Sequence, residues 1–262
     1  MRTAGVRRDR TTFWRRGSGQ FAALAAAALA IAALVLVAAS SAQERVSHEA
    51  GEFESLGSST GIVIAAPHGT FDANTAAMAI DIARRLGAGY VVFRGTSGGL
   101  RINVNRPTEG AGRACANEVQ SDRAQAVYNT YARLVRIAGG GDRLSLYVEI
   151  HGNVASQSAQ NIETASKGVT AAEAQAMKDG YPAILAAIRH DWPGYPALRL
   201  LVEPADRIFF TASCAKALGI FSTDLVPRAL HFEFPRAARE PPLLDGTSTL
   251  TASLLKRFLQ PR

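Results

Sequence analysis

The segment Gly61-Ile62-Val63-Ile64-Ala65-Ala66-Pro67-His68-Gly69 decides the fold of this chain. Its apolar run is rich in β-branched residues and ends at a proline, which is typical of a strand buried on both faces. Strands of that kind belong to parallel sheets that are covered by helices. The segment also carries a candidate functional residue, His68, directly after the strand.

Further apolar runs alternate with helical patterns on the C-terminal side of this strand. We predict strands at 90–93, 144–150, 197–202 and 229–234, and helices at 73–86, 117–138, 170–190 and 247–259. Because parallel strands need crossover connections, this order predicts a three-layer α/β/α sandwich with a mainly parallel sheet. Ligands of such folds bind outside the carboxyl ends of the strands, so residues that follow a strand are the first candidates for a site.

The length of 262 residues and the 47% hydrophobic content suit one folded domain after a short N-terminal region. We divide the chain into a signal peptide or anchor at 1–42, a polar linker at 43–60 and a single domain at 61–262. Of the net charge of +7, six arginines and one aspartate before residue 43 contribute +5. The folded part is therefore near neutral, which argues against a nucleic-acid partner.

The N-terminus has the layout of a targeting segment. An arginine-rich stretch precedes the apolar run 21–39, and the small residues Ser40, Ser41 and Ala42 follow it. This order is typical of a secretory signal that is cleaved before Gln43. The alternative is an uncleaved anchor, because a run of that length can span a bilayer. We expect an exported protein, periplasmic or secreted, that contacts a membrane only if the segment stays uncleaved.

The two cysteines, Cys115 and Cys214, lie far apart in the sequence. In an oxidising compartment they can form one disulfide, or they can remain two separate thiols. The sequence leaves both possibilities open.

Two side chains of the kind that bind metals follow the first strand on a single loop. His68 comes two residues after Ala66, and Asp72 lies four residues further on. Imidazole nitrogen and carboxylate oxygen are good zinc ligands, and one loop can present both. The alternatives are a structural turn role for His68 and an N-cap role for Asp72 at the following helix.

A second histidine repeats this arrangement after another strand. In Glu149-Ile150-His151-Gly152-Asn153, His151 stands at the end of an apolar run and before a glycine, as His68 does. Two histidine nitrogens and the carboxylate of Asp72 form a three-ligand set with a fourth position for water, which is the arrangement of catalytic zinc sites. The sequence therefore predicts Zn²⁺ as the cofactor.

The last strand ends in His231-Phe232-Glu233-Phe234-Pro235-Arg236. Alternation sends the two phenylalanines to one face and His231 and Glu233 to the other. Glu233 is the predicted catalytic residue, acting as general base and then passing the proton to a leaving amine. The alternative is a buried salt bridge from Glu233 to Arg236 or another arginine. His231 is placed beside the site, where it orients a ligand or an intermediate.

Arginines are the candidates for binding an acidic substrate, because a guanidinium holds a carboxylate with two hydrogen bonds. Arg106, its neighbour Asn105 and Arg236 are the predicted substrate-binding residues. The alternative for the arginines is an ordinary surface position.

Four of these motifs together resemble the N-formylglutamate amidohydrolase family. They are Pro-His-Gly at 67–69, Asn-Arg-Pro at 105–107, Glu-Ile-His at 149–151 and His-Phe-Glu-Phe-Pro-Arg at 231–236, within a resemblance that spans about 61–239. That family and the related poly-γ-glutamate hydrolases and zinc carboxypeptidases imply a phosphorylase/hydrolase-like fold. They also imply one zinc bound by His68, His151 and Asp72, with Glu233 as the base and Arg106 as a substrate clamp. Asn103 departs from the family pattern, which has an acidic residue there.

These observations predict an exported zinc-dependent amidohydrolase that cleaves a C–N amide bond in an N-acyl amino acid or a small acidic peptide. One alternative is a zinc hydrolase of poly-γ-glutamate or of peptidoglycan peptides. Another is a metal-free ligand-binding protein on the same fold. The expected partner is a small-molecule or peptide substrate.

Overall fold

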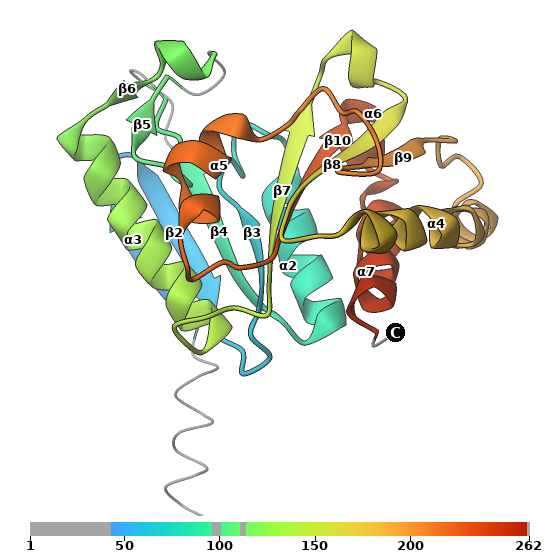
Figure 1. Cartoon of the computed structure of the whole chain (residues 1–262), viewed down its shortest axis with the longest axis horizontal. Coiled ribbons are helices and arrows are strands. Elements are labelled where there is room, and N and C mark those ends of the chain that lie inside the picture. Colours follow the sequence, from blue (N-terminus) through green and yellow to red (C-terminus); the bar gives the residue numbers. More distant parts are fainter. Residues whose placement is uncertain (1–42, 96–100, 111–113, 261–262) are drawn as a thin grey trace, which may run out of the picture. The chain divides into compact units, whose positions relative to one another are not determined.

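The computed structural model describes residues 43–95, 101–110 and 114–260. The expected signal segment at 1–42, with its apolar run 21–39, lies outside the described residues. Eight strands form one sheet in the order β1-β2-β4-β3-β7-β10-β8-β9 (Figure 1). Their bounds are β1 Gln43–His48, β2 Gly51–Leu56, β3 Ile62–Ala66, β4 Gly89–Gly95, β7 Leu146–Asn153, β8 Asn161–Lys167, β9 Arg199–Val202 and β10 Ala229–Pro235.

The helices and the short elements complete the described chain. The α-helices are α2 Thr75–Leu86, α3 Asp122–Gly139, α4 Ala171–Asp191, α5 Ser213–Leu218, α6 Arg236–Arg239 and α7 Leu244–Leu259. The 3-10 turns are η1 Cys115–Asn117, η2 Ser156–Ser158 and η3 Ile220–Ser222, and β5 Thr108–Glu109 pairs with β6 Val119–Gln120 in a small second sheet.

Parallel pairing runs through the centre of the large sheet. Strand β3 pairs in parallel with β4 and β7, β7 with β10, and β8 with β9. The pairs β1–β2, β2–β4 and β8–β10 are antiparallel. The sheet is therefore mostly parallel with antiparallel additions, and helices flank it. This confirms the predicted α/β class, with a mainly parallel sheet.

Alternate residues of each central strand enter two separate cores. Ile64, Val148 and Phe232 pack in the core that includes residues of α2, α4 and α7. Val63 and Tyr147 pack in the other core, with residues of α3 and η3. Each central strand is thus covered on both faces, which explains its nearly continuous apolar sequence. The face with α3 is also the face toward which the odd-numbered residues of β7 point.

Residues 43–60 do not form the expected linker. They contain β1 and β2, an antiparallel hairpin that extends the sheet next to β4. The segment looks unpatterned in sequence because Glu54 is a polar residue inside the sheet, where it accepts hydrogen bonds from the hydroxyl of Tyr90 and from Arg94, each at 2.8 Å. Phe53 is fully buried, with its ring centroid 4.7 Å from that of Phe93.

The burial of Phe53 predicts that the hairpin contributes to global stability. We expect Phe53→Ala to lower the free energy of unfolding by about 3–5 kcal/mol, because a large buried ring is lost and a cavity remains. The measurement is the urea midpoint and slope of the purified chain. Val46→Ala, on the edge strand and only partly buried, is the matched control and should cost much less. Equal, small losses for both variants would mean that the hairpin unfolds separately.

Strand β8 was not expected from the sequence. Its residues are mostly polar, but it lies between β10 and β9, and several of its polar side chains are buried. Glu163 is an example, because its carboxylate accepts hydrogen bonds from the backbone N–H groups of Phe209 and Phe210, at 2.7 and 3.0 Å. Hydrogen-bond partners from distant loops stabilise the buried polar side chains of this strand. No local sequence pattern predicts those partners.

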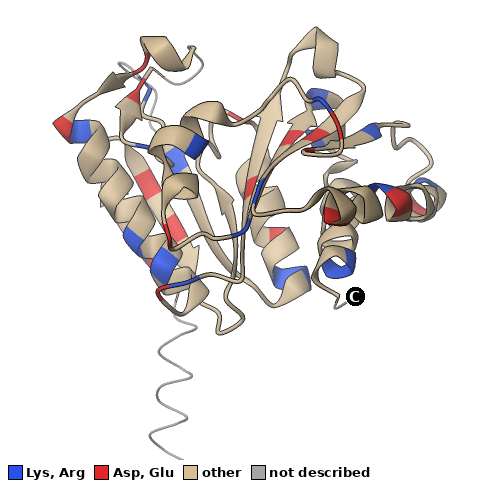
Figure 2. Cartoon of the chain, viewed as in Figure 1, with Lys and Arg blue, Asp and Glu red and all other residues tan. Residues whose placement is uncertain are grey.

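Cys115 and Cys214 form a disulfide, with their Cα atoms 5.5 Å apart. It joins η1 to α5, so the first of the two possibilities left open by the sequence holds. Lys and Arg positions are interspersed with Asp and Glu positions along the helices in Figure 2, and acidic positions also occur within strands. Within the described ranges, no helix has the length and apolarity needed to cross a membrane.

Candidate metal centre

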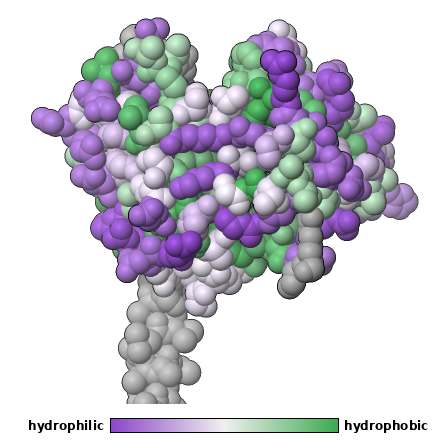
Figure 3. Space-filling model, in the orientation of Figure 1, coloured by the Kyte–Doolittle hydropathy of each residue, from purple (hydrophilic) through white to green (hydrophobic). Residues whose placement is uncertain are grey.

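The candidate residues meet at the carboxyl ends of three adjacent strands. His68 follows β3, His151 lies near the end of β7, and Glu233 lies near the end of β10. Figure 3 shows a hollow at the top of the molecule, between two lobes. In the same orientation, the central strands point up toward this hollow (Figure 1). The arrangement follows the rule that ligands bind at this edge of an α/β sheet.

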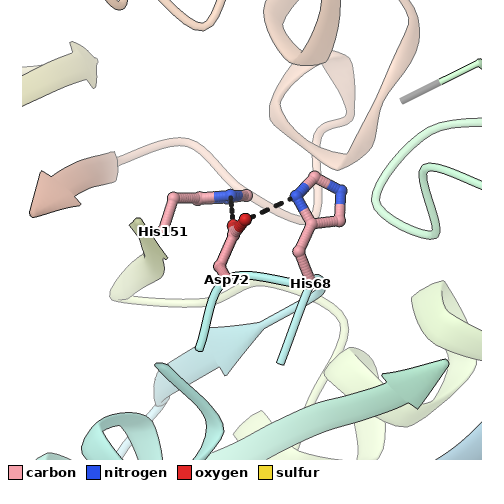
Figure 4. A group of neighbouring side chains, drawn as sticks. All are labelled: His68, Asp72 and His151. Atoms are coloured by element: carbon pink, nitrogen blue, oxygen red, sulfur yellow. Dashed lines mark ion pairs between the residues drawn. The ribbon is translucent and has the colours of Figure 1, made fainter. Parts of the chain in front are cut away.

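His68, Asp72 and His151 form a compact group that fits a metal ion (Figure 4). The Oδ2 atom of Asp72 lies 3.4 Å from the Nδ1 atoms of both His68 and His151. A tetrahedral zinc site with bonds of about 2.1 Å has ligand atoms about 3.4 Å apart. The spacing of the two contacts is therefore that of a tetrahedral site. All three side chains are mostly buried, and those of His68 and Asp72 retain slight exposure.

Both histidines are oriented through their other ring nitrogen. His68 Nε2 lies 3.1 Å from the backbone oxygen of Asn103, and His151 Nε2 lies 3.0 Å from a carboxylate oxygen of Glu149. When each Nε2–H donates to its oxygen, Nδ1 carries the lone pair that a metal requires. Metal-ligating histidines commonly have such a partner. This second set of contacts is the feature that best separates the group from a chance ion pair.

A second group of possible ligands shares one histidine with the first. It consists of Glu149, His151 and His231, all buried. The Glu149 carboxylate is already enclosed, because it accepts hydrogen bonds from Asn105 and Tyr147 as well as facing both imidazoles. A catalytic metal needs a coordination position that a substrate can reach. The group of His68, Asp72 and His151 satisfies this condition better.

The ionisable groups at the centre strongly shift one another's pKa values. Burial by itself would lower the pKa of His151, but Asp72 and Glu149 raise it to about 10. Burial would raise the pKa of Asp72 and of Glu149, but their contacts with the imidazoles hold both well below the usual range. Burial lowers the pKa of His68. Two carboxylates thus stay ionised in a buried place, one at each ring nitrogen of His151.

Asp72 does not cap the helix that follows it. The N-cap residue of α2 is Asn74, and the backbone oxygen of Asp72, not its carboxylate, accepts from Thr75. The side chain is free to face the two histidines. The N-cap alternative for Asp72 is therefore wrong.

Arg239 ties together the loops that carry the group. Its guanidinium donates to backbone oxygens of Ala73, Asn153 and Phe234, which follow or end strands β3, β7 and β10. The glycine after His151 makes this possible, because a Cβ atom on Gly152 would lie 2.2 Å from Cζ of Arg239. The glycine next to His151 thus has a packing reason here.

Glu233 lies beside His151 in the register of the sheet, on the neighbouring strand β10. Its Oε1 atom lies 3.2 Å from Nε2 of His231, while its Oε2 atom is buried and has no hydrogen-bond partner among the described residues. Arg236 instead pairs with Glu240, at 2.8 Å, and is largely exposed. Glu233 therefore has His231 at one oxygen and no partner at the other among the described residues, and the alternative of a salt bridge to Arg236 is wrong.

The expected substrate-binding residues Arg106, Asn105 and Arg236 each have a partner within the chain. Arg106 forms a buried ion pair with Glu118, and Asn105 donates to Glu149 at 3.0 and 3.1 Å. Arg236 points away, to Glu240. Arg101, which sequence reasoning did not choose, has a terminal nitrogen 3.8 Å from Asp72.

Sequence reasoning also gave no role to Glu149 and Glu118. A signal for Glu149 was available, because a residue two positions before His151 in a strand faces the same side, and a buried acid in a strand is unusual. No local signal was available for Glu118, whose partner is twelve residues away on another loop.

No protein-family model and no curated protein match the chain. Solved structures with a similar arrangement include a bacteriophage poly-gamma-glutamate hydrolase, at 12% identity over 82% of this chain and 93% of that chain, with a TM-score of 0.46. A gene product from Agrobacterium tumefaciens is 13% identical over 77% and 91%, with a TM-score of 0.49. A metallo-carboxypeptidase from Pseudomonas aeruginosa is 13% identical over 93% and 70%, with a TM-score of 0.43. These comparisons do not confirm the N-formylglutamate amidohydrolase family.

Proposed function

We propose that this protein is an exported zinc-dependent amidohydrolase that cleaves a C–N amide bond in an N-acyl amino acid or a small acidic peptide. The observation that carries the proposal is the placement of one carboxylate oxygen of Asp72 at 3.4 Å from Nδ1 of both His68 and His151. The carboxylate of Glu233 on the adjacent strand supplies the second requirement, a base next to the metal group.

The donor set fits zinc better than magnesium or calcium, because two imidazole nitrogens and one carboxylate are borderline-soft ligands. A zinc ion in this position supplies Lewis-acid polarisation of the scissile carbonyl and lowers the pKa of a water molecule toward about 7. The residues that would hold it are His68, Asp72 and His151.

The chain's own residues perform the proton transfers. Oε2 of Glu233, which has no hydrogen-bond partner in the described chain, accepts a proton from the attacking water. His231 lies at Oε1 and keeps that oxygen engaged, so the carboxylate presents the other one. Glu233 then donates the proton to the leaving nitrogen, which completes cleavage of the C–N bond.

Export is supported by two independent features of the chain. The N-terminal sequence has the order of a secretory signal, and the disulfide between Cys115 and Cys214 is of a type that persists in oxidising compartments.

The test joins metal analysis to a hydrolysis panel. We expect about one zinc per purified chain. Hydrolysis of at least one member of a panel of N-formyl-glutamate, γ-glutamyl peptides and muropeptides should be lost on chelation and restored by Zn²⁺. A chain that binds no zinc and hydrolyses none of them, but still binds one, would instead be a ligand-binding protein on this fold.

A further inference from the structure

We propose that Arg106 is a positioning residue for the metal centre, and that it does not bind the substrate. It belongs to a turn, residues 103–106. This turn contacts Nε2 of His68 directly and Nε2 of His151 through the carboxylate of Glu149. This inference rests on the proposed function, since it concerns the same metal group. It also replaces the substrate-clamp role that the sequence suggested for Arg106.

The first end of the turn reaches His68. The backbone oxygen of Asn103 lies 3.1 Å from Nε2 of His68, opposite the nitrogen that faces Asp72. Asn103 is itself fixed, because its backbone N–H donates to the backbone oxygen of Thr108 and its side-chain amide donates to the hydroxyl of Thr108, at 2.7 Å. The direction of the His68 ring therefore depends on where the turn lies.

The other end of the turn reaches His151 through one intermediate. Nδ2 of Asn105 donates to both carboxylate oxygens of Glu149, at 3.0 and 3.1 Å, and Glu149 in turn accepts from Nε2 of His151 at 3.0 Å. Both Asn105 and Glu149 are fully buried. One short turn thus sets the orientation of the two imidazoles that come from different strands.

Arg106 holds the Asn105 amide in the required direction. Its Nη1 donates to Oδ1 of Asn105 at 3.0 Å, which leaves Nδ2 of that amide facing Glu149. Its Nε and Nη2 donate to the two oxygens of Glu118, at 2.8 and 2.5 Å. All three guanidinium nitrogens are therefore engaged within the protein. The Glu118 side chain is 1% exposed, so this pair is not one that a substrate displaces from solvent.

The backbone of the turn is held in a conformation that its residues do not favour. Val104 has a φ of 64°, in the left-handed region that β-branched residues avoid. Such a conformation persists only where surrounding contacts determine it. The contacts here are the pairing of Asn103 with Thr108, the bond from Ile220 N–H to the backbone oxygen of Asn105, and the Arg106–Glu118 pair.

The test measures Zn²⁺ affinity of the purified full chain by competition with a chromophoric chelator. In Arg106→Gln/Glu118→Gln the ion pair is replaced by two neutral amides, so no buried charge is left alone. We expect about 10- to 100-fold weaker zinc binding, the usual cost of losing a partner that orients a ligand. If Arg106 were a substrate clamp, the double variant would keep its zinc affinity and raise only the KM.

Two further variants serve as controls. One tests whether the change of charge itself causes misfolding, and the other tests whether Arg106 acts on the metal group through Asn105. Arg106→Lys keeps the charge next to Glu118 but cannot reach Asn105 at the same time, so it should fold and still bind zinc several-fold more weakly. Asn105→Ala combined with Arg106→Gln/Glu118→Gln should bind zinc no more weakly than Asn105→Ala alone, because the arginine acts through the asparagine.

Arg228→Gln is the matched control, because Arg228 pairs with Glu173 at the opposite, amino end of β10. Its zinc affinity should equal that of the unsubstituted chain. Zinc affinities of the Arg106 variants within twofold of that chain would overturn the inference while leaving the proposed function intact. If the unsubstituted chain bound no zinc, the proposed function would fail and the inference with it.

Discussion

Replacing His151 with alanine is expected to release zinc and to abolish hydrolysis. The proposed site has three protein ligands, and zinc binding by small protein sites is worth about 10–16 kcal/mol. Losing one ligand of three should therefore weaken binding by about 10²- to 10⁴-fold. The variant also leaves Asp72 and Glu149 without the imidazole that both of them face. We expect His68→Ala to behave in the same direction.

The measurement is zinc content after gel filtration, together with the rate on whichever panel substrate the unsubstituted chain hydrolyses. His190→Ala is the control, because His190 is an exposed histidine near the end of α4. It should keep both zinc and activity. Retention of zinc by both His151→Ala and His68→Ala would show that the metal group has been assigned to the wrong residues.

The second large effect is expected for Glu233→Gln. Glutamine has nearly the same shape and can keep the contact with His231, but it cannot accept a proton. We expect zinc to stay bound and kcat to fall by about 10²- to 10⁴-fold, the usual contribution of a positioned general base. The substitution separates the base from the ligands, because only the ligands should affect the metal.

Steady-state rates and zinc content of the same preparation test this prediction. Glu240→Gln provides the control, since Glu240 is a partly exposed glutamate whose partner is Arg236. Turnover by Glu233→Gln at the unsubstituted rate would require a different base. Loss of zinc from Glu233→Gln would instead mean that Glu233 helps to hold the metal.

The strands that the sequence predicted are those that lie inside the parallel part of the sheet. Both faces of β3 and β7 are buried, and each strand contains an apolar run that is visible locally: all of β3, and residues 146–148 of β7. Strands β2 and β8 escaped prediction because buried polar residues interrupt their pattern. Glu54 and Glu163 are stabilised by groups that lie far away in the sequence, such as Arg94 and the backbone of Phe209.

The residues of the candidate site also fall into those that the sequence could identify and those whose partners only the fold determines. His68, His151 and Glu233 could be chosen as candidates from the sequence because each stands at the end of an apolar strand, and the topology of a parallel sheet brings such ends together. The roles of the arginines were not predictable, because a guanidinium reaches several ångströms and its partner is set by tertiary packing. Arg106 pairs with Glu118 and Arg236 with Glu240, while Arg239 joins three loops.

The sequence by itself determined the class of the fold and the strand ends that carry the candidate residues. Apolar periodicity and strand order are properties of the local chain. Only the tertiary structure decided which atoms face which. It turned Nδ1 of both histidines toward Asp72 and gave their other nitrogens to Asn103 and Glu149. Ring orientation depends on hydrogen-bond partners from other loops, and those partners become neighbours only when the chain is folded.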